Sequence, residues 1–229
     1  MLHVPEFKPY YDVIIVGARC AGAATALLLA KGGVRVLAID RHGYGSDTLS
    51  THALMRPAVM QLSRWGLLEP LIHGGAPVIT STTFHYGEEE VAIPIRPEPS
   101  IPGLIAPRRT VLDRELVDAA RDAGATIVHD VAVQDLNVDA AGRVCGVVLK
   151  DADGHTRALA ASYVIGADGI GSMVARKVQA PTLIRGRASV AHIFGYAAAP
   201  DSSGYHWYFR PGVSGGMIPT NNGLACIVA

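Results

Sequence analysis

A glycine-rich turn near the N-terminus is the part of the sequence whose residue types most directly suggest chemistry. It reads Gly17-Ala18-Arg19-Cys20-Ala21-Gly22. The first glycine permits a tight turn, and the last lets a following helix lie close to a sheet. The start of that helix offers unpaired N–H groups and the positive end of its dipole to a phosphate. Arg19 replaces the glycine that usually lets the backbone approach the phosphates, yet the turn still predicts a dinucleotide site. The candidate site residues in the turn are Gly17, Cys20, Ala21 and Gly22.

A carboxylate follows this turn at a suggestive spacing. Asp40 ends the apolar run 34–39, where dinucleotide sites place an acid that accepts a hydrogen bond from the adenosine ribose. We place its neighbour Arg41 in the same site. FAD and NAD both carry this ribose, so Asp40 leaves the choice between the two cofactors open.

Three elements are expected to position these residues. Residues 11–16 form a short apolar run, residues 20–31 are rich in Ala and Leu without Pro, and residues 34–39 are apolar again. This order predicts a strand, a helix and a strand, with parallel strands and a right-handed crossover. The fold class is therefore α/β, with a Rossmann-like βαβ domain at the N-terminus.

A second group of strands is expected further along the chain. Apolar runs at 131–138, at 144–150 and up to Ile165 are separated by turns rich in Asp and Gly at 139–142 and 151–154. This pattern predicts a three-stranded antiparallel meander. The meander is followed by Asp168, Gly169 and Ser172, and then by a short helical stretch at 173–177 that contains Arg176.

The glycine turn, the meander and the residues Asp168, Gly169, Ser172 and Arg176 together resemble a known family. They are similar to the FAD-dependent monooxygenases of the p-hydroxybenzoate hydroxylase type, within the glutathione-reductase-like flavoproteins. The resemblance covers roughly residues 11–180. It implies that the cofactor is FAD, that Asp168 forms a hydrogen bond near the ribose and pyrophosphate of FAD, and that the same turn helps to receive NAD(P)H.

Three looser matches follow from the same resemblance. The segment 46–52 lies before a helix opened by Pro57, where the family's chain passes along the FAD, so Ser50 is a candidate contact. Ser and Thr before a helix are otherwise caps and turn formers. Arg109 resembles the family arginine that reaches the FAD, with Arg108 as its solvated alternative. The backbone at Val131 corresponds to the place where the family holds the adenine.

The remaining segments predict a second domain. We expect residues 10–76 and 105–180 to form a discontinuous FAD-binding domain, and 77–104 with 181–229 to form part of a substrate-binding β-sheet domain. Strands are predicted at 79–86, 91–95, 188–199, 205–210, 215–219 and 224–229. Residues 205–209 either line a substrate pocket or belong to the core of their own sheet. The chain stops before the Gly-Asp turn with which the family continues, so we expect a C-terminally truncated fragment.

The composition narrows the possible partners. Lys and Arg together number 20, as do Asp and Glu, so no net charge attracts nucleic acid or an anionic membrane. Three well-separated cysteines fit neither a disulfide framework nor a CxxC metal site. No apolar run is long enough for a signal peptide or a membrane span. We therefore expect a soluble cytoplasmic protein without a nucleic-acid partner, without a bound metal and without a membrane span.

The resemblance implies an NAD(P)H-dependent monooxygenase. In such enzymes NAD(P)H binds transiently and reduces the FAD, molecular oxygen adds to give a flavin hydroperoxide, and a small organic substrate is hydroxylated. We single out no catalytic side chain, because the flavin carries the chemistry. His52, His85, His192 and His206 are interpreted as structural or surface residues. The substrate, the choice between NADH and NADPH, and the oligomeric state stay open.

Three alternatives to the monooxygenase are kept. A geranylgeranyl-reductase-like flavoprotein would have a similar cofactor-binding half but would reduce a prenyl double bond. A non-catalytic FAD-binding fragment would retain the cofactor without turnover. A flavin-dependent halogenase is disfavoured, because Gly215-Gly216-Met217 stands before Ile218-Pro219 in place of a pair of tryptophans.

Overall fold

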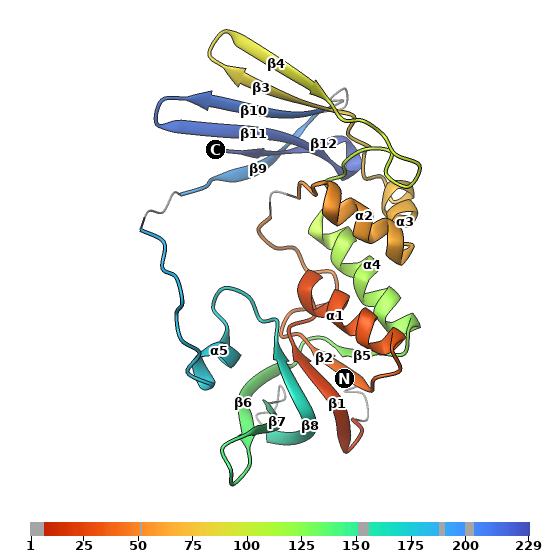
Figure 1. Ribbon diagram of the computed structural model, residues 1–229, viewed down its shortest axis with the longest axis vertical. Helices are drawn as coiled ribbons and strands as arrows, with labels where there is room; N and C mark the ends of the chain where they lie inside the picture. The colour runs from red at the N-terminus through yellow and green to blue at the C-terminus, as the bar shows by residue number, and fades with distance from the viewer. Residues whose placement is uncertain (1–6, 51, 151–155, 188–190, 200–203) are drawn as a thin grey trace. The chain divides into compact units, whose positions relative to one another are not determined.

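The computed structural model divides the chain into two compact units. It describes residues 7–50, 52–150, 156–187, 191–199 and 204–229. The first unit comprises Met1–Ser46 with Asp113–Arg185, and the second comprises Asp47–Leu112 with Gly186–Ala229. Each unit contains one six-stranded sheet (Figure 1).

The sheet of the first unit has the strand order β5-β2-β1-β8-β7-β6. Strands β1 (Tyr10–Val16), β2 (Val36–Ile39) and β5 (Thr126–Val128) are parallel to one another. Helix α1 (Cys20–Lys31) connects β1 to β2 (Figure 1). The predicted strand, helix and strand are thus confirmed. All four residues of β2 are buried, as expected for a central parallel strand that is covered on both faces.

The predicted meander completes this sheet. Strands β6 (Ala132–Val138), β7 (Val144–Lys150) and β8 (Thr156–Gly166) pair antiparallel in that order. Strand β8 then pairs parallel with β1 along most of its length. The meander therefore joins the βαβ unit in one sheet, and β8 ends beside β1. The turn predicted at 151–154 lies outside the described residues.

The core of the first unit lies between this sheet and its helices. Small residues on the buried side of α1, among them Ala23 and Ala26, let the helix lie close to the strands. Helix α4 (Arg109–Asp122) begins in the second unit and continues into the first, and helix α5 (Met173–Lys177) follows β8. The largest fully buried side chains of the first unit are Tyr11, Ile14, Ile15, Leu27, Leu37 and Ile39.

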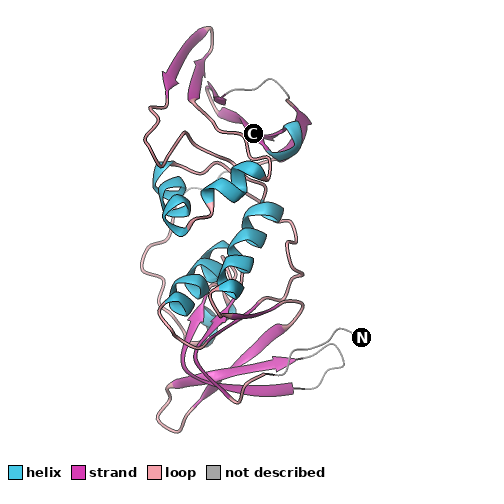
Figure 2. Cartoon of the chain, turned by 90° about the vertical axis from the view of Figure 1, so that its right-hand side faces the viewer, coloured by secondary structure: helices cyan, strands magenta, loops and turns pink. Residues whose placement is uncertain are grey.

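The second unit is built around another sheet, with the order β4-β3-β10-β11-β12-β9. Figure 2 draws these strands in magenta and the helices in cyan. The helices are α2 (Arg56–Trp65) and α3 (Leu68–His73), with the short 3-10 helix η1 (Asn221–Gly223). The strands are β3 (Ser81–Tyr86), β4 (Glu89–Pro94), β9 (Phe194–Ala198), β10 (Gly204–Arg210), β11 (Val213–Thr220) and β12 (Leu224–Val228). Strands from the two separate chain segments therefore share one sheet. Residues 188–190 of the predicted strand 188–199 lie outside the described residues.

The compact units divide the chain differently from the expected domains. Residues 47–76 and 105–112 lie in the second unit, whereas the sequence placed them with the FAD-binding domain. The physical reason is hydrogen bonding to the C-terminal segment of that unit. His52 Nε2 pairs with the Tyr196 hydroxyl at 2.6 Å. The Arg108 amide donates to Asn221 Oδ1 at 2.9 Å. The assignment of these segments to cofactor binding stays a prediction. Among the described residues, no helix is both long and apolar enough to cross a membrane.

Candidate cofactor site

The two glycines of the N-terminal turn are required by close backbone contacts. Gly17 has a φ of +98°, and a Cβ there would lie 2.4 Å from the carbonyl oxygen of Ala167. At Gly22 a Cβ would lie 1.8 Å from the carbonyl oxygen of Gly17. Real Cβ atoms do not approach backbone oxygens this closely. The end of β1, the start of α1 and the end of β8 therefore meet at one point, and only glycines fit between them.

The start of α1 offers a site for an anion. Arg19 is the N-cap residue; among the described residues its side chain forms no capping hydrogen bond, and the first turn contains no acidic residue. The first N–H groups of a helix have no partners within the helix. Of the other predicted residues, Ala21 is exposed, and the Cys20 thiol donates to Asp113 Oδ1 at 2.9 Å. The geometry suits a phosphate approaching along the helix axis.

Asp40 connects this turn to the chain after β2. Its side chain is 6% exposed. One carboxylate oxygen accepts a hydrogen bond from the Ala18 amide at 2.8 Å, and the other accepts one from the His42 amide at 2.9 Å. The sequence predicted only a ribose contact for this carboxylate. In the structure Asp40 also holds the glycine turn against the loop after β2, while Arg41 is exposed and its Nε donates to His42 Nε2.

A small cavity lies beside Asp40 within the first unit. Its lining residues are Ala18, Arg19, Asp40, Gly43, Gly45, Ser46, Asp113, Val117 and His129. Val131, where an adenine contact is predicted, is near in the chain to His129. The Val131 amide donates to the Asp40 carbonyl oxygen at 3.1 Å. That amide is therefore already used within the protein, which leaves the Val131 carbonyl for the predicted adenine contact.

Asp168 accepts hydrogen bonds at the start of helix α5, whose N-cap residue is Ser172. Its carboxylate accepts hydrogen bonds from Ser172 Oγ at 2.6 Å and from the amides of Met173 and Val174 at 2.6 and 3.2 Å. Ser172 Oγ in turn accepts from the Ala175 amide at 3.0 Å. The contact with FAD that the resemblance implies for Asp168 stays a prediction. The structure shows that its carboxylate fixes the turn next to Gly17.

The hydrogen bonds of Asp168 lead to a prediction on acid stability. Burial raises the pKa of Asp168, but hydrogen bonds from Ser172, Val174 and Met173 outweigh burial and hold this pKa below its ordinary value. Such a carboxyl stabilises the fold above its unfolded pKa, and this stabilisation is lost as the pH falls through the folded pKa. We expect Asp168→Asn to lower the free energy of unfolding by about 1 kcal/mol at pH 7, with the difference from wild type narrowing below about pH 4.

Urea unfolding of both proteins at pH 7 and at pH 3 measures this difference. Asp122→Asn is the matched control, because Asp122 is an exposed residue at the end of α4. If Asp168→Asn lowers the free energy of unfolding by the same amount at both pH values, the stabilisation by Asp168 does not depend on its charge and the prediction is wrong.

Two predicted cofactor contacts, Ser50 and Arg109, lie in the second unit. Ser50 Oγ accepts a hydrogen bond from the His52 amide at 3.1 Å, which is the turn-forming role that the sequence kept as its alternative. Arg109 is the first residue of α4. Their contacts with the cofactor stay predictions.

A polar cluster in the second unit was missed by the sequence analysis. The Arg108 side chain is only 18% exposed and is not the solvated neighbour that was expected; its Nη2 donates to Asp47 Oδ2 at 2.6 Å. Its guanidinium carbon lies 3.8 Å from the centre of the Tyr196 ring. The Tyr196 hydroxyl pairs with Nε2 of His52 at 2.6 Å. His52 is 3% exposed and has a φ of +63°. No local pattern signals this cluster, since Tyr196 is 144 residues from His52.

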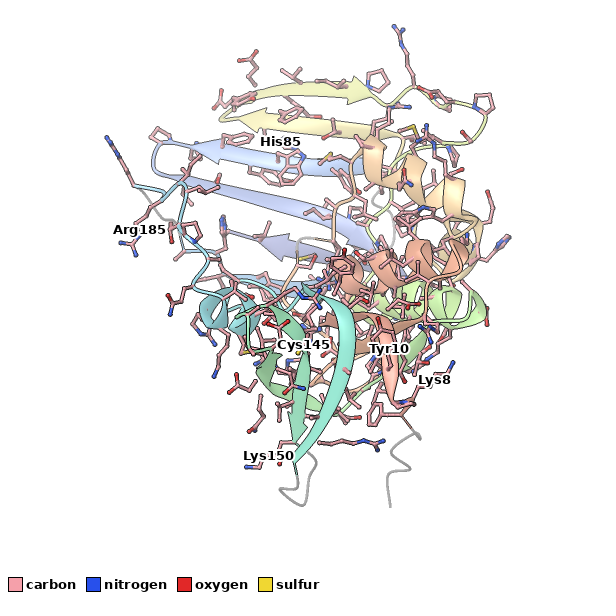
Figure 3. All side chains as sticks on the ribbon, turned by 60° about the horizontal axis from the view of Figure 1, so that its bottom comes forward. Lys8, Tyr10, His85, Cys145, Lys150 and Arg185 are labelled. Atoms are coloured by element: carbon pink, nitrogen blue, oxygen red, sulfur yellow. The ribbon has the colours of Figure 1, made fainter. Side chains whose placement is uncertain are left out.

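Two further histidines form a pair on the same unit's sheet. His85 Nε2 on β3 lies 3.0 Å from His206 Nδ1 on the neighbouring strand β10, and Figure 3 labels His85 on this sheet. The Tyr208 ring stacks on His85 at 4.3 Å. Burial and the neighbouring His85 lower the pKa of His206. His192 is exposed. Within the described part of the chain, no group of three His, Cys, Asp or Glu residues is arranged to hold a metal ion.

Comparisons with known proteins agree with the geometry of the first unit. A family model described as FAD binding domain matches residues 10–228. The chain is 33% identical over 199 residues to menaquinone reductase of Mycolicibacterium smegmatis, covering 84% of this chain and 45% of that protein. It is 28% identical over 182 residues to digeranylgeranylglycerophospholipid reductase 1 of Methanococcoides burtonii, covering 74% of this chain and 40% of that protein. The chain thus spans less than half the length of these two relatives.

Among solved structures, p-nitrophenol 4-monooxygenase PnpA from Pseudomonas putida superimposes with a TM-score of 0.82 at 19% sequence identity. The match covers 96% of this chain and 58% of that one. PqsL from Pseudomonas aeruginosa, described as a probable FAD-dependent monooxygenase, superimposes with a TM-score of 0.79 at 21% identity, over 96% of this chain and 60% of that one. At these identities the likeness is one of fold.

Proposed function

Because the chain belongs to the FAD binding domain family, we propose that the full protein is an NAD(P)H-dependent monooxygenase that hydroxylates a small organic substrate. The observation that supports the proposal is the glycine turn in the first unit, packed against the turn that carries Asp168. The described residues contain no second strand–helix–strand unit with a glycine-rich turn, because the strand that follows β8 and α5 is β9, which belongs to the other sheet. A transient visit of NAD(P)H, without a nucleotide-binding unit of its own, is consistent with that arrangement.

The residues of the first unit fit FAD. Gly17 and Gly22 allow the close backbone packing that places the start of α1 beside the end of β1, where its N–H groups can meet a pyrophosphate. Asp40 has a second lone pair on each carboxylate oxygen for a ribose hydroxyl. Bound FAD would supply the hydride acceptance and the oxygen activation that amino-acid side chains lack. The protein's own part is to bind, to orient and to exclude water.

A second candidate is the reduction of an isoprenoid double bond. It is favoured by the 33% identity to menaquinone reductase and the 28% identity to digeranylgeranylglycerophospholipid reductase 1. The first unit serves both candidates equally well, because each needs the same bound FAD. The two candidates differ in what consumes the electrons, molecular oxygen or the substrate itself.

Flavin reduction and reoxidation distinguish these candidates. Full-length protein loaded with FAD is mixed with NADPH or NADH without oxygen in a stopped-flow instrument, alone and with 4-nitrophenol or menaquinone. For a monooxygenase we expect the organic substrate to accelerate flavin reduction, and oxygen uptake and a hydroxylated product to follow once air is admitted. A saturated menaquinone side chain formed without oxygen would favour the reductase. The monooxygenase would be contradicted if the rate of flavin reduction by NAD(P)H were the same with and without each substrate and no oxygen uptake followed.

A further inference from the structure

Arg19 occupies the position in the turn where a glycine usually lets the backbone approach the phosphates. It is the N-cap residue of α1, with an extended backbone (φ −83°, ψ −166°). Because Arg19 carries a Cβ, a phosphate cannot come as close to its backbone as it would to glycine. A dinucleotide site with this turn needs another source of contacts to the phosphates.

The Arg19 side chain is held beside that place. Its Nη2 donates to Ser46 Oγ at 3.3 Å, and both residues line the small cavity next to Asp40. A guanidinium has five N–H donors, and Ser46 takes only one of them. Among the described residues, Arg19 forms no ion pair. Its charge and most of its donors are therefore available to a ligand.

The cavity is lined by carboxylates whose negative charge would repel a pyrophosphate, and the Arg19 guanidinium can offset this repulsion. Two of the lining side chains are buried carboxylates, Asp40 at 6% and Asp113 at 4% exposure. Burial, followed by the charge of Arg121, lowers the pKa of His129, which disfavours its charged form. Arg19 is the only Lys or Arg among the lining residues. Arg114 packs against Gly45, and Arg121 Nη2 lies 3.4 Å from His129 Nδ1, so both arginines also lower the negative potential near the cavity. Arg19 is the cation at the N-cap of α1, where a pyrophosphate would bind.

We propose that Arg19 is a phosphate-binding residue, whose guanidinium, positioned by Ser46, donates charge-assisted hydrogen bonds to the pyrophosphate of the cofactor. These bonds take the place of the close backbone approach that a glycine would allow. The inference rests on the proposed binding of FAD by the first unit. It assigns a phosphate contact to Arg19, a residue that departs from the usual glycine pattern.

The test compares cofactor affinities of Arg19 variants of the full-length apoprotein. Arg19→Gly restores the usual glycine, Arg19→Lys keeps the charge but loses the planar fork, and Arg143→Ala removes an arginine from the exposed turn after β6. Affinities for FAD, ADP and adenosine are measured by calorimetric titration. Circular dichroism verifies that each variant is folded, and Arg19→Lys carries the test if Arg19→Gly is not.

We expect Arg19→Gly to weaken FAD and ADP binding roughly ten-fold to a hundred-fold, the loss expected for a hydrogen bond to a charged group. The affinity of Arg19→Lys for FAD and ADP is expected to lie between that of Arg19→Gly and that of wild type. The affinity for adenosine is expected to be unchanged in all variants. Arg143→Ala is expected to bind all three ligands as wild type does. If Arg19→Gly binds FAD as tightly as wild type or more tightly, the arginine is only an obstacle in the turn and the proposal is overturned. Absence of saturable FAD binding by the wild-type protein is a different result, which overturns the proposed function itself.

Discussion

Replacing Gly22 by valine is expected to abolish flavin retention by the full-length protein. A Cβ at this position would lie 1.8 Å from the carbonyl oxygen of Gly17 and 3.3 Å from a methyl carbon of Ile15. Two backbone segments meet there, so neither can yield as the end of a flexible side chain would. The start of α1 has to move away from the sheet, and its N–H groups move with it. Valine adds two further methyl groups to a contact that has no room for the first carbon.

The flavin content of the purified variant, read from its visible spectrum, and titration with added FAD measure this loss. Gly195→Ala is the matched control, because an added Cβ at Gly195 meets no atom within 4 Å. Gly22→Ala is expected to lose flavin as well, but less of it than Gly22→Val. A yellow Gly22→Val protein with the flavin content of wild type would contradict the role given to this contact.

Replacing Asp40 by alanine is expected to destabilise the first unit as well as to weaken FAD binding. The buried carboxylate accepts hydrogen bonds from the amides of Ala18 and His42. Leaving a buried donor unpaired costs about 1–3 kcal/mol for each group. Asp40→Asn keeps one acceptor oxygen and places an NH2 group where the other oxygen was. Its free energy of unfolding is therefore expected to lie between those of wild type and Asp40→Ala.

Urea unfolding of the apoprotein separates this structural effect from cofactor binding, which is titrated independently. Asp122→Ala serves as the control, because it removes an exposed carboxylate from α4. A lower FAD affinity of Asp40→Ala with an unchanged free energy of unfolding would mean that Asp40 acts on the ribose alone.

The local elements of the first unit could be predicted from the sequence because their signals lie within a few residues of one another. The turn from Gly17 to Gly22 separates a buried strand from a helix rich in alanine, and the structure confirms both. The meander is similarly marked by its Asp- and Gly-containing turns. The expectation that Gly22 packs the helix against the sheet agrees with the 1.8 Å that would separate an added Cβ from the Gly17 carbonyl oxygen.

Contacts between distant parts of the chain could not be predicted in the same way. The pairing of β8 with β1 joins residues about 150 positions apart. Arg108 appeared solvated in the sequence because Tyr196, whose ring it covers, lies far along the chain. The hydrogen bonds of His52 to Tyr196 and of the Arg108 amide to Asn221 join these segments to the C-terminal part of the second unit, and they too are long-range.

Hydrogen bonds from backbone amides give Asp40 and Asp168 structural roles that the sequence did not predict. A sequence pattern identifies Asp40 and Asp168 as acids near a nucleotide, but it carries no information on which amides their oxygens accept from. In the structure Asp40 holds the turn through Ala18, and Asp168 holds the start of α5 through Met173 and Val174. Both acids thus shape the candidate site in addition to any contact with the cofactor.

We expect the cofactor to lie on the glycine turn of the first unit. Amide hydrogen exchange of the full-length protein, with and without FAD, tests it most directly, since a bound phosphate protects the amides to which it bonds. We predict that FAD slows exchange in peptides that cover residues 17–23 and 166–174, and that this protection is lost in Gly22→Val. Unchanged exchange in these peptides, with protection by FAD confined to other parts of the chain, would show that the cofactor does not bind at the glycine turn.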